Sequence, residues 1–171
     1  MKPSEVLPSE YNPFYKRYID LVGNSDLFDA LTKGLKTSEV FFENLPDNKW
    51  DYRYAEDKWT PKDILLHIAD TERVFAYRAL YFARINNAEL KGFDENIFAE
   101  NAGANNMSVA QLLKNYVAVR NATLNLFKNF DINQLIQQGV ANGSPMSVRA
   151  AGFVICGHEI HHCNIITERY L

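Results

Sequence analysis

The amino-acid sequence predicts an all-α fold, a four-helix bundle that occupies residues 1–171 as one domain. Three observations lead to this prediction. Apolar residues recur at the three- and four-residue spacing of a buried helix face in four long segments. Helix-start signals are clear in two of these segments, and no segment has a convincing strand pattern. The length fits one domain of roughly 100–200 residues, and the 47% hydrophobic content is typical of a globule with a core.

The N-terminal part is predicted to contain an extended arm and two helices. Residues 1–12 form the arm, and Pro13 lies near the first turn of a short helix. The first long helix is expected to begin with Ser25 as its N-cap and to stop at Pro46. Its buried face is predicted to consist of Phe28, Leu31, Leu35, Phe42 and Leu45.

An aromatic segment, residues 48–59, separates the first two long helices. It is predicted to be a loop that packs its rings over one end of the bundle, because a lone strand would have no partner. Thr60, followed by Pro61 and then by Asp63, predicts a capped helix start. The second long helix is expected to extend from there to about Ile85.

The last two long helices follow breaks in the apolar pattern. Residues 86–107 are rich in Asn, Gly and Ala and are long enough to cross the bundle, which predicts parallel second and third helices in an up-down-down-up order. Ser108 and Gln111 form a capping box that opens the third helix. The segment GVANGSP interrupts the chain again. The fourth helix is expected to begin between Ser144 and Ser147 and to continue almost to the C-terminus.

Charge and hydropathy exclude several classes of function. The formal charge of −3 gives no reason to expect nucleic acid or acidic membranes as partners, and no apolar run is long enough to span a membrane. The N-terminus lacks the apolar core of a signal peptide, so we expect a cytoplasmic protein. Cys156 and Cys163 are seven residues apart, roughly 10 Å along one helix, which is too far for a disulfide. Both thiols are expected to be reduced and inert.

Histidines carry the strongest chemical signal. Three of the four lie in GHEIHHCNII, residues 157–166. His158 and His162 are four residues apart and share one helix face, while His161 remains possible on geometry. His67 lies on the inward face of the second helix and comes level with them if the second and fourth helices are antiparallel. Three imidazoles suit zinc, nickel, iron or copper. The alternative is that each is a core histidine hydrogen-bonded to a carbonyl or carboxylate.

The same stretch also matches H-E-x-x-H, the metalloprotease motif in which Glu159 would be the general base. The context contradicts this match. Only nine residues follow His162, and the one acidic residue among them, Glu168, lies on the same helix. We therefore reject a protease and expect Glu159 on a polar or interfacial face.

Further residues could serve a site beside His67. Asp63 and Thr71 share its helix face and are candidates to orient its ring. Arg78 and Arg120 lean inward and could bind an anionic group of a substrate, although surface salt bridging is the simpler role for both. Three aromatic residues could cap the pocket, with packing as the alternative: Tyr52, Tyr54 and Trp59.

Three segments give the chain a resemblance to the DinB-like superfamily, four-helix proteins regarded as metalloenzymes that include the bacillithiol S-transferases. They are KWTPKDILLHIADTERVFAYRALYFAR (58–84), KGFDENIFAENAG (91–103) and SVRAAGFVICGHEIHHCNIITERYL (147–171). The resemblance covers most of the chain from about residue 25 onward. It is specific for the superfamily and not for one reaction, because members differ in chemistry.

The resemblance implies one divalent metal ion held by His67, His158 and His162, with His161 beside the site or at an interface. Zinc or nickel comes first, and iron or manganese next. It further implies small-molecule chemistry, often with a low-molecular-weight thiol as cosubstrate, and a homodimer. The first hypothesis is thus a thiol S-transferase-like metalloenzyme. The alternatives are a metal-dependent hydrolase, a non-catalytic metal-binding bundle that acts in stress, and a purely structural bundle.

Overall fold

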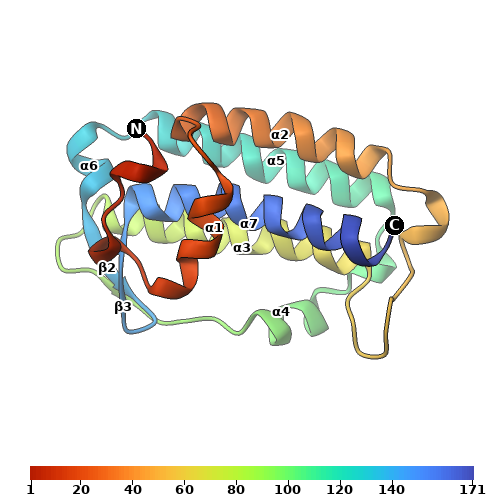
Figure 1. The fold of residues 1–171 in the computed structure, drawn as a ribbon. Coiled ribbons are helices and arrows are strands. Elements are labelled where there is room, and N and C mark those ends of the chain that lie inside the picture. Colours follow the sequence, from red (N-terminus) through yellow and green to blue (C-terminus); the bar gives the residue numbers. More distant parts are fainter.

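Four long helices form the body of the protein in the computed structural model, which describes residues 1–171 (Figure 1). Because these helices pack side by side, the predicted four-helix bundle is confirmed. They are α2 (Leu27–Glu43), α3 (Pro61–Phe82), α5 (Val109–Lys128) and α7 (Val148–Arg169).

Each long helix packs against two others. α3 contacts α5 and α7, and α2 contacts the same two helices from the opposite side. α3 and α7 are antiparallel, since the Tyr170 hydroxyl after the end of α7 donates a hydrogen bond to the Trp59 carbonyl before the start of α3. α3 and α5 run the same way (Figure 1). The start of α3 therefore lies beside the end of α7.

Two helix starts lie where the capping residues predict them. Thr60 accepts a hydrogen bond from the backbone N–H of Asp63, and Ser108 accepts one from Gln111. The prediction of Ser25 as the cap of the first long helix is wrong, because the Asp26 carboxylate accepts the hydrogen bond from Phe28 N at 3.0 Å. Serine and aspartate are both favoured at the N-cap, and Ser25 is followed directly by Asp26, so the sequence alone does not distinguish them.

The second long helix ends at Phe82, three residues before the predicted Ile85. Ile85 is 47% exposed, so no burial favours another turn of helix. Asn87 then adopts a positive φ of 53°, which reverses the chain.

Short elements enclose the bundle on one side. Residues 1–12, predicted as an extended arm, contain two 3-10 turns, η1 (Pro3–Glu5) and η2 (Pro8–Glu10), and they bury Val6 and Tyr11. The short helix predicted after Pro13 is present as two further elements. These are η3 (Pro13–Tyr15) and α1 (Lys16–Leu21), which packs on α7.

A small sheet is the main feature that the sequence pattern does not predict. Its strands are β1 (Glu89–Leu90), β2 (Gln138–Ala141) and β3 (Ser144–Ser147), with β1 parallel and β3 antiparallel to β2. Asn142 and Gly143 form the two-residue turn of the hairpin, both with positive φ, as this turn requires. The connections also contain elements η4 (Asp47–Lys49), α4 (Glu95–Ala102), η5 (Ala104–Asn106) and α6 (Ile132–Ile136).

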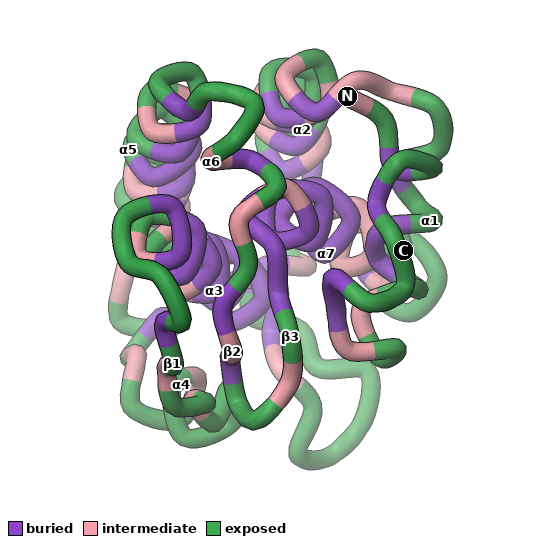
Figure 2. Tube along the Cα trace, turned by 90° about the vertical axis from the view of Figure 1, so that its left-hand side faces the viewer, coloured by how far each residue is buried: buried purple, intermediate pink, exposed green.

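Buried residues line the inward faces of the long helices (Figure 2). They form two hydrophobic clusters, one around Phe127 and Phe153 and the other around Phe42 and Tyr116. No helix combines the length and the apolarity that crossing a lipid bilayer requires.

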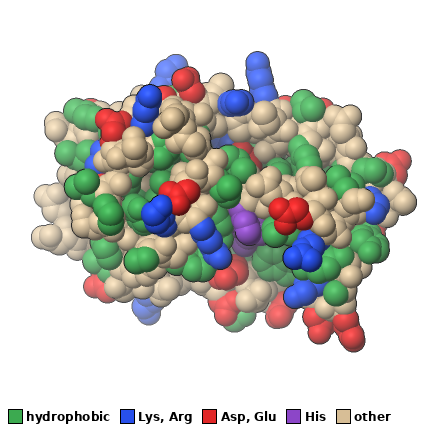
Figure 3. All heavy atoms as spheres, in the orientation of Figure 1, with side chains coloured by type: hydrophobic (Ala, Val, Ile, Leu, Met, Phe, Trp, Pro, Cys, Tyr) green, Lys and Arg blue, Asp and Glu red, His purple; other side chains and the backbone are tan.

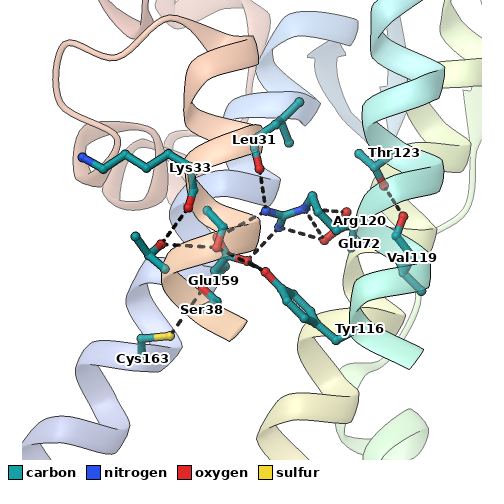
Figure 4. Close-up of polar contacts among 12 residues, drawn as sticks. Leu31, Lys33, Ser38, Glu72, Tyr116, Val119, Arg120, Thr123, Glu159 and Cys163 are labelled. Atoms are coloured by element: carbon teal, nitrogen blue, oxygen red, sulfur yellow. Dashed lines mark hydrogen bonds and ion pairs between the residues drawn. The ribbon is translucent and has the colours of Figure 1, made fainter. Parts of the chain in front are cut away.

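A buried ion network joins the four long helices between these clusters (Figure 4). Arg120 of α5 has no exposed surface and donates hydrogen bonds to the carboxylates of Glu72 in α3 and Glu159 in α7. Its Nη1 also donates to the carbonyl of Leu31 in α2, 3.2 Å away. The Tyr116 hydroxyl donates to Glu159. All five guanidinium N–H groups therefore have acceptors.

The network corrects two sequence-based interpretations. Arg120 lies neither on the surface nor in a substrate pocket, and Glu159 is 1% exposed instead of occupying a polar face. Burial raises the pKa of the Glu159 carboxyl, although Arg120 and Tyr116 oppose this shift. For Arg120 burial alone would lower the pKa, but the facing carboxylates of Glu159 and Glu72 outweigh it and raise the pKa.

We expect Arg120→Met to lower the free energy of unfolding by about 3–5 kcal/mol, because it leaves two buried carboxylates without a cation. Urea denaturation followed by circular dichroism measures this loss. The matched control is Arg73→Met, since Arg73 is exposed and its ion pair with Asp70 lies at the surface. That change should cost less than about 1 kcal/mol. Equal losses in the two variants would contradict a structural role for the network.

A second ion pair fastens the N-terminal segment to the start of α7. The Arg149 guanidinium donates to the Glu10 carboxylate, which is 2% exposed. Burial raises the pKa of Glu10, but the hydrogen bonds from Arg149 and from the backbone N–H of Leu7 outweigh it, and the net pKa is lowered. A lowered folded-state pKa gives stability above the unfolded-state pKa that is lost as pH falls through the folded value.

Glu10→Gln should therefore destabilise the protein by about 2 kcal/mol at pH 7. The difference from wild type should shrink as pH falls below about 4, where the wild-type carboxyl also becomes protonated. Urea unfolding of both proteins across this pH range is the measurement. A difference that stays constant with pH would show that the charge of Glu10 contributes nothing.

Candidate metal centre

Two antiparallel helices, α3 and α7, bring three histidines together. His67 projects from α3, and His158 and His162 project from successive turns of α7. The spacing of four residues places the last two rings on one face, as the sequence predicts. The antiparallel packing of α3 against α7 places His67 opposite them.

Gly157 lets α1 approach this part of α7. A Cβ at this position would lie 1.8 Å from the carbonyl oxygen of Tyr18, so only glycine permits the contact. The approach sets the Tyr18 ring against His158 and His161, with centroid distances of 5.4 Å to each. The short helix α1 thus forms one wall of the site.

The three Nε2 atoms point at a common centre. Nε2 of His158 lies 3.1 Å from Nε2 of His67 and 3.0 Å from Nε2 of His162. All three ligand atoms lie within 4.8 Å of one another. Metal–nitrogen bonds of about 2.1 Å at tetrahedral angles put ligand nitrogens about 3.4 Å apart, within about half an ångström of the two short separations.

Burial keeps these rings neutral. It lowers the pKa of His67 to about 4. It also lowers the pKa of His158 and of His162 well below the ordinary value, with the neighbouring histidines adding to the effect. At neutral pH each ring therefore offers an unprotonated nitrogen, the form that binds a metal ion.

Hydrogen bonding alone does not satisfy this arrangement. A neutral imidazole nitrogen is either a donor or an acceptor, and His158 Nε2 faces two other ring nitrogens at about 3 Å. The single proton or single lone pair on His158 Nε2 can form a good hydrogen bond with only one of these two ring nitrogens. A cation at the centre would accept all three lone pairs, so the donor set fits a divalent metal ion.

Of the two residues predicted to orient the His67 ring, only Thr71 contacts it. Thr71 Oγ1 lies 3.4 Å from His67 Nδ1 and can orient the ring. Asp63 does not reach His67, because its carboxylate accepts hydrogen bonds from Thr60 and Asn105 at the helix start. His161 packs beside His162, with ring centroids 5.2 Å apart, and its nitrogens lie outside the converging set.

A cavity of about 220 Å³ opens beside the histidines. Histidine atoms are visible between basic and acidic side chains near the middle of the face in Figure 3. Aromatic side chains dominate the wall, and Glu95 supplies its only carboxylate. Besides the histidines and Thr71, the lining comprises Phe14, Tyr15, Arg17, Tyr18, Trp59, Phe75, Phe93, Glu95, Asn96 and Val154.

Several of these lining residues escape prediction from sequence. Arg17 and Tyr18 belong to a short helix whose docking depends on Gly157, and Phe93 and Glu95 belong to the long connection before α5. The quoted segment KGFDENIFAENAG contains the last two, so the resemblance marks this segment without assigning roles within it.

Among the remaining aromatic candidates, Trp59 lines the histidine cavity, and Tyr54 lines a neighbouring cavity that His161 and His162 also border. Tyr52 lines neither of these cavities. Tyr52 and Tyr54 pack edge-to-face on Tyr170, as packing alone predicts. Both cysteines are free: burial raises the pKa of the Cys163 thiol to about 12 and that of Cys156 still further. They are therefore protonated and unreactive at neutral pH.

Comparison with known proteins identifies the family. Residues 30–166 match the DinB superfamily, which is most of the chain. The chain belongs to the DinB superfamily. Among solved structures, it is similar to YfiT from Bacillus subtilis, with a TM-score of 0.71 and 18% sequence identity over 98% of this chain and 90% of the other. YfiT is described as a probable metal-dependent hydrolase with an unusual four-helix bundle topology. No curated protein matches the chain.

The two tryptophans of this DinB superfamily protein provide a test of the site. The Trp59 ring lies 4.6 Å from the His67 ring, whereas Trp50 stacks on Phe42 in the buried cluster and lines no part of the histidine cavity. Adding Co²⁺ to Trp50→Phe, which retains Trp59, should quench most of its fluorescence, because a paramagnetic ion quenches a ring at close range. Trp59→Phe should respond weakly. A stronger response from Trp50 would place the ion elsewhere.

Proposed function

We propose that this DinB superfamily protein is a divalent-metal-dependent enzyme that acts on small molecules, with His67, His158 and His162 as the metal ligands. The convergence of three neutral Nε2 atoms beside an open cavity carries this proposal. A structural metal site is usually closed by a fourth protein ligand, whereas a catalytic site keeps a position open. No carboxylate or thiol of the chain joins the three histidines here.

An ion held by these histidines would act as a Lewis acid that lowers the pKa of a water or thiol beside it. The protein's own groups supply the rest of the site. Aromatic walls exclude bulk water and bind the apolar part of a substrate. Thr71 holds the His67 ring through its Nδ1. Glu95 is the residue available to accept a proton from an attacking water.

Hydrolysis is the reaction that these groups support best. It needs a water nucleophile and a proton acceptor, and the cavity has one carboxylate positioned on its wall. The description of YfiT as a probable metal-dependent hydrolase agrees with this choice.

Thiol transfer is the second candidate. The cavity contains a cationic side chain, Arg17, that forms no ion pair with a carboxylate of the chain, and it contains no reactive cysteine. An anionic low-molecular-weight thiol would therefore have to enter from solution, where Arg17 attracts it. A non-catalytic metal-binding role is less well supported, because such a role does not need the open cavity.

Metal content is the first test. The protein purified without a histidine tag or chelators should contain about one divalent ion per chain by plasma mass spectrometry, with zinc and nickel as the first ions to examine. His67→Ala, His158→Ala and His162→Ala should each lose it, because two imidazoles bind far more weakly than three. His161→Ala is the matched control and should retain the ion. A wild-type protein that remains empty after reloading with each metal would falsify the proposal.

Glu95→Gln separates the two reactions. In a screen of esters, amides and phosphoesters it should lower kcat by roughly 10²-fold or more, since it removes the proton acceptor. In an assay of thiol consumption with an electrophile it should change kcat little, because a thiol bound as thiolate needs no base. If the loaded enzyme turns over neither class of substrate, the non-catalytic alternative is favoured.

A further inference from the structure

Arg78 is a buried cation without an anion. Only 3% of the residue is exposed, and its Nη1 atom has no hydrogen-bond partner. None of the ion pairs of the chain includes it. The guanidinium instead lies 4.7 Å from the Phe75 ring centroid and 5.7 Å from that of Phe93. A buried unpaired charge is costly, and these two rings offset only part of that cost.

A second cavity, of about 270 Å³, borders Arg78. Its remaining polar wall comes from Asn12, Asn142 and Ser144, which are neutral, and from Glu95. Asn12 donates a hydrogen bond to the Ser144 hydroxyl, so these two side chains partly satisfy each other. The cavity therefore combines one buried cation with three neutral hydrogen-bonding side chains, and its one carboxylate, Glu95 of α4, is exposed to solvent and unpaired with Arg78. A buried cation among neutral donors and acceptors is suited to an anion.

This cavity adjoins the histidine cavity. Both are lined by Phe14, Tyr15, Phe93 and Glu95. On α3, the residues His67, Thr71, Phe75 and Arg78 are spaced by four, four and three positions, so they fall within a sector of roughly 80° on one face. Arg78 and His67 are eleven residues apart, or roughly 16 Å along the helix axis. Phe75 lines the histidine cavity and contacts the guanidinium, so it lies between the two ends.

We propose that Arg78 binds the anionic group, a carboxylate or a phosphate, of an elongated small molecule whose reacting atom lies at the histidines. This rests on the proposed function for the reacting end. The guanidinium fork matches two oxygens of a carboxylate or phosphate, and the aromatic side chains that line both cavities would contact the apolar middle of the molecule. The substrate class is therefore an amphiphilic anion in preference to a neutral molecule.

Two features of the chain could compete with this proposal. Glu95 could swing onto Arg78 and serve as its partner, in which case no anion from solution would bind. Arg17 lines the histidine cavity only and could attract an anion there instead. Variants of the two arginines distinguish these cases.

The test uses the full-length protein treated with chelator, so that a metal ion cannot bind the probe. Titration with 3-phenylpropionate and with its neutral amide is followed by NMR of backbone amides and of arginine Nε–Hε groups. The carboxylate should bind roughly tenfold more tightly than the amide, the size expected for a charge-assisted hydrogen bond, and should shift the Arg78 Nε signal. Arg78→Gln should abolish this preference, and Arg17→Gln should retain it.

A second variant leaves Arg78 in place in case its removal disturbs folding. Asn142→Asp is nearly isosteric and adds a carboxylate to the wall of the same cavity, so it should weaken 3-phenylpropionate binding by roughly tenfold. The proposal is overturned if the carboxylate preference persists in Arg78→Gln, disappears in Arg17→Gln alone, or is unchanged in Asn142→Asp. Equal binding of acid and amide by the wild type, as Glu95 pairing predicts, also overturns it.

The two proposals can fail separately. The metal proposal fails on metal content, which does not depend on Arg78. The anion site fails on these titrations, which contain no metal. His158→Ala/His162→Ala should keep the carboxylate preference while it loses the metal ion.

Discussion

The Arg120 network is the interaction on which the rest of the bundle depends. One guanidinium reaches acceptors on α2, α3 and α7, and its five N–H groups leave no donor unpaired. Gly34 makes room for this ion pair, because a Cβ at that position would lie 2.3 Å from Oε1 of Glu159 and 2.8 Å from Nη1 of Arg120. Replacing a buried ion network by apolar side chains is often neutral for stability. The network's contribution is therefore to fix how the helices are aligned, because another alignment would leave a buried charged group without its partner.

That alignment also assembles the histidine site. Glu72 follows Thr71 on α3, and Glu159 follows His158 on α7. Successive helix residues project about 100° apart, so when each glutamate faces Arg120, the residue before it faces the site. If α3 slid by one turn against α7, both the ion pairs and the convergence of His67 with His158 would be lost. The ion network and the histidine site thus depend on the same register of α3 against α7.

Local signals in the sequence predict much of this structure. Capping residues at Thr60 and Ser108 mark helix starts, and the four-residue spacing of His158 and His162 fixes their common face. Burial of charge is harder to predict, because a helical Arg or Glu looks the same in sequence whether it lies at the surface or in a network. For Glu159 the difficulty is greater, because its place in an H-E-x-x-H match suggests a catalytic role instead of a buried ion pair. The hairpin escapes the periodicity pattern because its strands have only four residues, and the turn residues Asn142-Gly143 are its one signal in the sequence.

The site divides into a rigid part and an adaptable part. The rigid part lies on the two longest helices, α3 and α7, whose register the buried network fixes. It consists of the three histidines, Thr71 and Arg78. The opposite wall comes from η3, α1 and the segment before α5, and α4 has no buried residue to anchor it. Substitutions in these short elements can reshape the cavity without moving the histidines or unpairing a buried charge. A fold built this way can keep the three converging histidines while the cavity beside them changes. If the two proposals hold, the position of Arg78 on the rigid side would make an anionic group the less variable part of the substrates.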